Sequence, residues 1–243
     1  MLQKKQFLKN RQSKLSALLL SMTIFNVLLV VFRLNWVGFD WGGVNYYRDV
    51  FFFRNEPTFL FLIWNLFLAW IPYLLSLVVK RLQTKGKLWP ITLALIGLWL
   101  LFFPNAPYLV TDLLHLKQRS IIPYWYDVIL FLSFSVTGLL LGLMSLYPIH
   151  QFFKQYLPKP LEHGLIILLI FLGSLGVYIG RFLRWNSWDI IYQPKGLLTD
   201  LHNILFYPSE LFPELGITAL FFFLLYPLYW LVKTMMESNS KVF

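Results

Sequence analysis

The sequence predicts an all-α polytopic membrane protein, a bundle of six transmembrane helices with both termini in the cytoplasm. Its 243 residues are 58% hydrophobic and only 13% charged, whereas soluble proteins average about 45–50% and 25%. Several apolar runs reach roughly the 20 residues that cross a bilayer. Basic residues are concentrated in alternate loops, as the positive-inside rule requires. These features exclude a soluble enzyme, and the absence of cysteine excludes disulfides and thiolate metal sites.

The first three spans are bounded by charge or by proline. The run 15–32 follows a basic cytoplasmic N-terminus (1–14) and precedes no small-residue cleavage site, so we expect an uncleaved helix. The run 58–79 ends at a Lys-Arg pair. The run 88–103 has only 16 residues and ends at a Pro-Asn-Ala-Pro segment, which disfavours continuation of the helix.

The last three spans complete a single transmembrane domain over residues 15–232. The run 128–147 ends at a proline, the run 164–180 begins and ends with glycine, and the run 216–232 precedes a cytoplasmic tail, 233–243. An even number of spans places the two termini on the same side of the membrane.

The distribution of charge predicts which side that is. The N-terminus, the tail and the two loops on their side hold 13 of the 21 basic residues but only 2 of the 11 acidic residues. Excess Lys and Arg marks the cytoplasmic side. The net charge of +10 is therefore a topology signal, and we expect membrane lipids and no nucleic acid as partners.

Three longer loops face outward and are rich in Trp and Tyr. They cover residues 33–57, 104–127 and 181–215. Amphipathic aromatic rings prefer the headgroup region, so we expect these loops to lie in the outer interface. Any functional site is expected on this side.

The Pro-Asn-Ala-Pro segment at 104–107 is the first candidate element. Sixteen helical residues span about 24 Å, short of the roughly 30 Å hydrocarbon core, so the chain is expected to unwind near the outer interface. Asn105 could then satisfy freed backbone groups or contact a substrate. The alternative is an ordinary helix end with a proline stop.

Asp112 and His115 follow this break and, three residues apart, would share one helix face. A carboxylate beside an imidazole can form an oriented general base, so both are candidate catalytic residues. The pair could instead ligate a metal, with a third ligand supplied by folding; the candidates for it are Asp127, Asp189, Asp200 and His202. The sequence does not decide whether a metal or a cofactor binds here. The alternative interpretation of the pair is an Asp that caps the helix beside a solvated His.

A second polar stretch follows the fifth span. If the helix continues, Arg181 and Arg184 share a stripe, with Asn186 and Asp189 beside it. Guanidinium groups at the end of an apolar span can bind phosphate or carboxylate oxygens, so all four are candidate substrate-binding residues for a lipid phosphate. The alternative is a pair of snorkelling arginines in an aromatic belt.

The remaining polar residues carry weaker expectations. Mild polar groups within the spans, such as Asn26 and Asn65, are expected to join helices. His150 and His163 are placed in a short cytoplasmic loop near Glu162 and are expected to be solvated.

Two strings carry a resemblance to a known family. They are Phe103-Pro-Asn-Ala-Pro-Tyr-Leu-Val-Thr-Asp-Leu-Leu-His115 and Tyr178-Ile-Gly-Arg-Phe-Leu-Arg-Trp-Asn-Ser-Trp-Asp189. They resemble the two signature blocks of domain-of-unknown-function family 1361. The resemblance implies a multi-pass protein of a prokaryotic plasma membrane, and it implies no activity or site residues.

Three functional hypotheses follow. The first is an outward-facing interfacial enzyme that acts on a polar lipid or lipid-linked phosphate. The second is a permease for lipids or small solutes, with the broken third span as its hinge. The third is a structural or assembly subunit of a membrane complex, whose protein partner the sequence does not identify.

Overall fold

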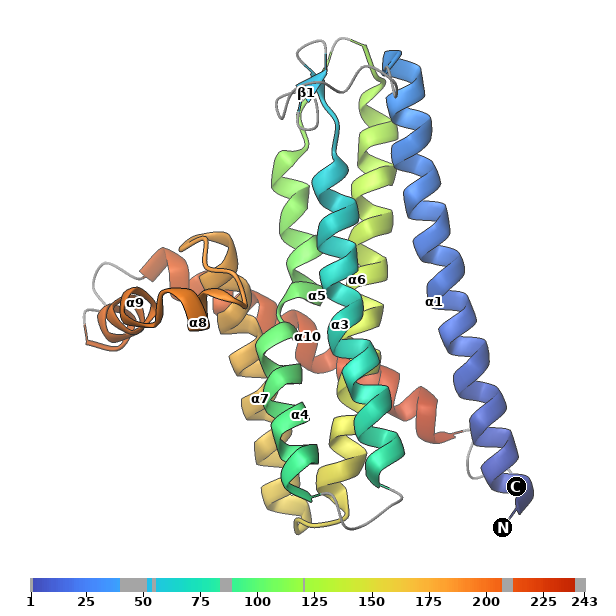
Figure 1. Cartoon of the computed structure of the whole chain (residues 1–243), viewed down its shortest axis with the longest axis vertical. Helices are drawn as coiled ribbons and strands as arrows, with labels where there is room; N and C mark the ends of the chain where they lie inside the picture. Colours follow the sequence, from blue (N-terminus) through green and yellow to red (C-terminus); the bar gives the residue numbers. More distant parts are fainter. Residues whose placement is uncertain are drawn as a thin grey trace.

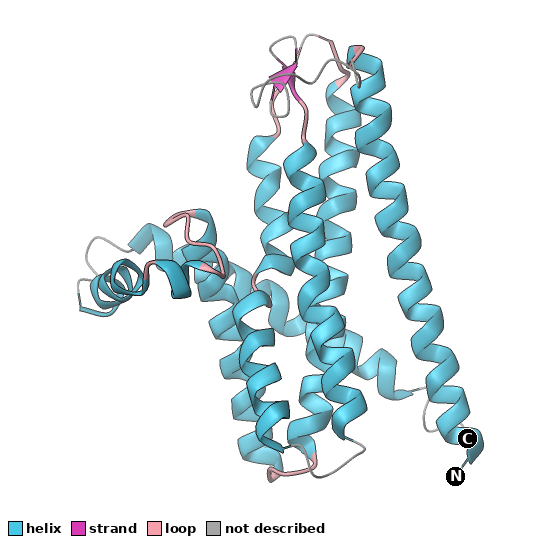
Figure 2. Cartoon of the chain, in the orientation of Figure 1, coloured by secondary structure: helices cyan, strands magenta, loops and turns pink. Residues whose placement is uncertain are grey.

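The computed structural model describes residues 2–39, 52–53, 56–83, 89–119, 121–206 and 212–238 (Figures 1 and 2). This part contains six helices that are long and apolar enough to cross a membrane. They are Gln12–Val37, Leu60–Gln83, Trp89–His115, Tyr124–Lys154, Lys159–Arg181 and Gly216–Ser238. The prediction of an all-α bundle with six spans is confirmed.

The elements follow the chain in a simple order. They are α1 (Leu2–Val37), α3 (Leu60–Gln83), α4 (Trp89–Phe102), α5 (Asn105–Tyr108), the 3-10 helix η1 (Leu109–His115), α6 (Tyr124–Lys154), α7 (Lys159–Arg181), α8 (Asp189–Tyr192), α9 (Pro194–Phe206) and α10 (Phe212–Ser238). Two-residue strands, β1 (Phe52–Phe53) and β2 (Glu56–Pro57), pair antiparallel. Most of the expected loop 33–57 lies outside the described residues.

The long helices α1, α3 and α6 run side by side, and α10 crosses the bundle at a slant (Figure 1). The beginning of α1 and the end of α10 lie at the same end, opposite β1. Lys80 near the end of α3 donates a hydrogen bond to Gln12 of α1. Glu237 of α10 lies 3.5 Å from Lys154 at the end of α6. We call the other extremity the β1 end.

The third span does not end at Pro104, as the sequence predicts, but resumes as α5 and η1 and reaches His115. Pro104 is the N-cap of α5 and Pro107 lies in its first turn. Backbone N–H groups of a first helical turn have no intrahelical acceptor, so proline costs little there. The two prolines therefore interrupt the helix without ending the span.

Glycines of α6 and α7 give the interrupted span room to pack against these two helices. A Cβ on Gly138 would lie 2.4 Å from the Ala106 carbonyl oxygen, and one on Gly173 would lie 2.3 Å from the Phe103 ring. Phe103 and Ala106 are buried. Only a residue without a side chain lets the backbone of the broken span approach this closely.

We expect Gly138→Ala to destabilise the protein by about 1–3 kcal/mol, the usual cost of overpacking. The added methyl group would meet a backbone oxygen, which cannot rotate away. Gly164→Ala is the matched control, because a Cβ there meets nothing within 4 Å. Unfolding of both variants in a titration with sodium dodecyl sulfate measures the difference. Equal midpoints for the two variants would contradict the close packing at Gly138.

A buried ion pair joins α1 to α6 at the β1 end. Arg33 Nε lies 2.8 Å from Asp127 Oδ1, and Arg33 Nη1 donates to the Pro57 carbonyl oxygen at 2.5 Å. Arg119 Nη1 lies 2.9 Å from the other Asp127 oxygen. Both guanidinium groups also lie over the Phe59 ring, at 4.0 and 4.9 Å. The Asp127 carboxylate and the Arg33 guanidinium thereby connect α1, the Pro57 backbone and the segment 119–127.

His150 is not solvated, in contrast to the expectation from the sequence. The helix α6 has 31 residues and continues past Pro148 to Lys154, so it carries His150 into the packing. The imidazole is buried and bonds to the Tyr229 hydroxyl through Nδ1 and to the Glu162 carboxylate through Nε2. This cluster joins α6, α7 and α10.

Candidate functional site

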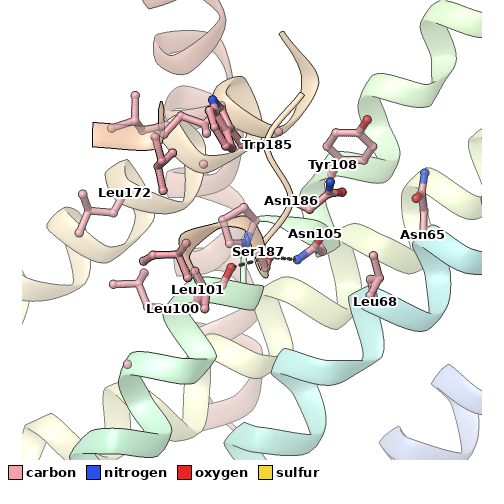
Figure 3. Close-up of a pocket in the computed structure, with 18 of the residues that line it drawn as sticks. Asn65, Leu68, Leu100, Leu101, Asn105, Tyr108, Leu172, Trp185, Asn186 and Ser187 are labelled. Atoms are coloured by element: carbon pink, nitrogen blue, oxygen red, sulfur yellow. Dashed lines mark hydrogen bonds between the residues drawn. The ribbon is translucent and has the colours of Figure 1, made fainter. Parts of the chain in front are cut away.

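A cavity of about 530 Å³ lies between α3, α4, α7 and the α8–α9 segment (Figure 3). Its walls are mostly apolar, formed by side chains such as Leu68, Leu100, Leu172 and Ile179. The polar groups come from α3, from the interrupted span and from the loop after α7. They are Asn65, Asn105, Tyr108, Trp185, Asn186 and Ser187. A mostly apolar cavity with few polar groups is typical of ligand sites.

Asp112 lies in η1, next to the cavity, with a fully buried side chain. Its Oδ2 accepts a hydrogen bond from the Asn65 amide at 3.0 Å, and its Oδ1 lies 3.3 Å from Arg181 Nη1. A buried carboxylate needs such partners, because the free energy of burying an unpaired charge is large. The two predicted blocks therefore meet through Asp112 and Arg181.

Arg181 is the last residue of α7, and 15% of its side chain is exposed. Its Nη1 also donates to the Tyr108 hydroxyl at 3.3 Å, and the guanidinium carbon lies 5.7 Å from the centre of that ring. Asn65 and Tyr108 both line the cavity. The Asp112–Arg181 pair therefore lies directly behind the polar end of the cavity.

His115 ends η1 on the same side of this helix as Asp112, since a 3-10 helix has three residues per turn. Its Nε2 lies 3.0 Å from Arg181 Nη2. A guanidinium only donates, so Nε2 is the acceptor and the proton of the neutral ring is on Nδ1. The ring is exposed and packs edge-on against Phe61 at 5.2 Å. We call Asp112, His115 and Arg181 the polar cluster.

Asn105 joins the two blocks at a second point. Its Nδ2 donates to the Phe102 carbonyl oxygen and to Ser187 Oγ, both at 3.0 Å. Ser187 in turn donates to the Leu101 carbonyl oxygen at 2.9 Å. These bonds satisfy carbonyl groups that the break at Pro104 leaves without a helical partner (Figure 3).

Arg184 does not share a stripe with Arg181, in contrast to the expectation from the sequence. Helix α7 ends at Arg181, and Arg184 has a positive φ of 60°, so the chain turns away. Its exposed side chain has no hydrogen bond or ion pair to the part of the chain that the structure describes. Asn186 and Asp189 bond to each other, with Asn186 Nδ2 3.1 Å from Asp189 Oδ2. Only Asn186 of these lines the cavity.

Sequence reasoning did not select Asn65, Tyr108 or Trp185 as site residues. Asn65 carries a signal, because it is an amide within an otherwise apolar run. Trp185 donates from Nε1 to Asp200 Oδ2 at 2.7 Å and so holds α9 beside the cavity. Nothing in the order of residues indicates this last contact.

A zinc site at the polar cluster is not assembled among the described residues. The structure brings together no group of three His, Asp or Glu side chains there that could hold a metal ion. The guanidinium of Arg181 lies between Asp112 and His115. The proposed third ligands Asp127, Asp189 and Asp200 bond instead to Arg33, Asn186 and Trp185.

The helices and the cavity together define a multi-pass membrane protein with a polar cluster at one end of an apolar cavity. The chain belongs to the family described as protein of unknown function DUF1361, whose family model matches residues 64–228. The match includes both signature blocks, so the resemblance drawn from them is confirmed. No curated protein and no solved structure matches the chain.

Proposed function

We propose that the protein binds a polar lipid or lipid-linked phosphate and that the polar cluster acts on its headgroup. The observation that supports this most directly is the apolar cavity that ends at Tyr108 and Asn65, in contact with Arg181. An amphiphile has the same two parts, an apolar chain and a polar head, in the same order.

Arg181 is suited to hold an anionic group. Its hydrogen bonds use both Nη1–H groups and one Nη2–H, toward Tyr108, Asp112 and His115. The Nε–H and the second Nη2–H have no partner among the described side chains. Charge-assisted hydrogen bonds from these two donors fit phosphate oxygens. Asp112, buried and bonded through both oxygens, positions the guanidinium.

His115 supplies the catalytic part of the proposal. When a phosphate oxygen also accepts the Nη2–H that Arg181 directs at His115, the lone pair of His115 Nε2 becomes free to accept a proton from water. The water oxygen would then attack phosphorus as Nε2 takes the proton, the ester P–O bond would break, and the protonated His115 would give that proton to the leaving lipid alkoxide, which departs as the alcohol. This assigns general-base catalysis to His115 and charge stabilisation to Arg181.

Gly97 offers a direct test of lipid binding. It lines the cavity from α4, and a Cβ there meets nothing within 4 Å. Gly97→Leu is therefore expected to fill the cavity without disturbing the fold and to lower the amount of retained phosphatidylmethanol severalfold. Gly164→Leu, in equally open space outside the cavity, is the control. The amount of phosphatidylmethanol that stays bound to each washed, purified variant is measured by mass spectrometry. Equal retention by the two variants would refute the proposal.

We also propose that the cavity faces outward from the plasma membrane of a prokaryote, with both termini in the cytoplasm. The excess of basic residues at the termini supports this orientation. Because the chain lacks cysteine, single introduced cysteines can report the orientation of the protein in the membrane. Lys117→Cys is expected to react with a membrane-impermeant maleimide in intact cells, and Lys159→Cys only after permeabilisation; both residues are exposed. The reverse pattern would invert the proposed topology.

A further inference from the structure

The polar side chains that line the cavity are uncharged, and three of them are asparagines. The orientation of each amide is fixed by a partner that can only accept a hydrogen bond. Asn65 Nδ2 donates to the Asp112 carboxylate, Asn105 Nδ2 to the Phe102 carbonyl, and Asn186 Nδ2 to the Asp189 carboxylate. Each nitrogen thus donates at least one of its two N–H groups to the protein, which fixes the orientation of the amide and leaves the oxygen atom for another partner.

The unused hydrogen-bonding capacity of the cavity is therefore rich in acceptors. The Oδ1 atoms of Asn65, Asn105 and Asn186 accept no hydrogen bond from the described part of the chain. The Tyr108 hydroxyl accepts from Arg181 and keeps its own proton to donate. A phosphate offers acceptors only, so it cannot satisfy three amide oxygens. A group of hydroxyls, each both donor and acceptor, can.

We propose that the headgroup of the bound lipid carries a neutral hydroxyl-bearing ring, a sugar or cyclic polyol, that binds among Asn65, Asn105 and Asn186. This deepens the proposed function and rests on it: the phosphate lies against Arg181 and the ring lies beside it in the cavity. The aromatic side chains of Trp64, Tyr108 and Trp185 line the same cavity. They offer apolar faces to the C–H groups of such a ring. Figure 3 shows Asn105 and Asn186 close to each other near Tyr108, with Asn65 across from them on α3.

The test compares two lipids that share acyl chains and a single negative charge but differ in the ring. Purified protein is incubated with mixed micelles of phosphatidylinositol and phosphatidylmethanol in equal amounts, and retained lipid is quantified by mass spectrometry. Two or more hydrogen bonds to the ring predict a preference for phosphatidylinositol of about tenfold. Tyr108→Phe and Asn186→Ala should each lower that ratio about threefold. Tyr124→Phe, outside the cavity, should leave it unchanged.

Three outcomes would overturn the inference. Equal retention of the two lipids, or a ratio unaffected by both cavity variants, would show that no ring is recognised. Binding of free inositol without retention of phosphatidylinositol would show that the hydroxyl-bearing ligand is not carried on a lipid. The Gly97→Leu variant separates the two proposals. If it lowers retention of both lipids equally and neither is preferred, only the ring is refuted; if it lowers neither, lipid binding itself fails.

Discussion

Asp127→Ala is expected to destabilise the protein by about 3–5 kcal/mol, the cost of leaving one member of a buried ion pair without its partner. Arg33 and Asp127 are each 1% exposed. Without the carboxylate, the Arg33 guanidinium keeps only the Pro57 carbonyl and the face of the Phe59 ring as partners among the described residues. Arg119 loses its bond to the same carboxylate. The contacts between α1, α6 and the segment after η1 weaken together.

The measurement is the unfolding midpoint in mixed micelles titrated with sodium dodecyl sulfate, followed by circular dichroism. Glu237→Ala is the control, because its pair with Lys154 is 3.5 Å long and partly exposed, at 49% for Lys154 and 35% for Glu237. Such pairs contribute about 0–1 kcal/mol, so this variant should unfold with the wild type. If Asp127→Ala also unfolds at the wild-type midpoint, Arg33 finds another partner and the ion pair does not hold the β1 end together.

Arg181→Gln is expected to have the largest effect on lipid binding. Hydrogen bonds to a charged group contribute about 1.5–3 kcal/mol, so retention of phosphatidylmethanol relative to phosphatidylcholine should fall at least about tenfold. Lys195→Gln removes an exposed positive charge from α9 and should leave that ratio unchanged. An equal fall in both variants would mean that only the overall charge attracts the lipid.

Two further variants separate binding from folding and from chemistry. The double variant Arg181→Gln with Asp112→Asn leaves no unpaired charge behind, so it should fold and still lose retention of the anionic lipid. His115→Gln should retain the lipid and lose release of the headgroup, measured as phosphate ester hydrolysis. Release at the wild-type rate by this variant would remove His115 from the proposed mechanism while leaving lipid binding intact.

The number and type of the membrane spans followed from the sequence because the hydrocarbon core imposes a simple requirement. A segment that crosses it must be helical and apolar over about 20 residues, and six runs satisfy this. The residue at which the third span ends did not follow from the sequence. Local rules treat Pro104 and Pro107 as stops, but glycines on α6 and α7 allow the interrupted backbone to pack and continue to His115.

The candidate site, too, could be predicted only in part from the sequence. The two blocks could be identified from the sequence, because charged and amide residues at the ends of apolar spans are costly and therefore conspicuous. Which of their residues meet could not. Arg181 and Arg184 are equivalent by sequence spacing, yet α7 ends between them, so one bonds to Asp112 and the other turns away.

The sequence by itself determined the class of the protein, its six spans and the two polar blocks, since composition and hydropathy act along the chain. Only the tertiary structure decided that Asn65 supports Asp112, that Arg33 pairs with Asp127 and that α9 lies beside the cavity. These contacts join residues 15 to 94 positions apart. The free energy of burying a polar group selects its partner by geometry in three dimensions, which no local pattern of residues records.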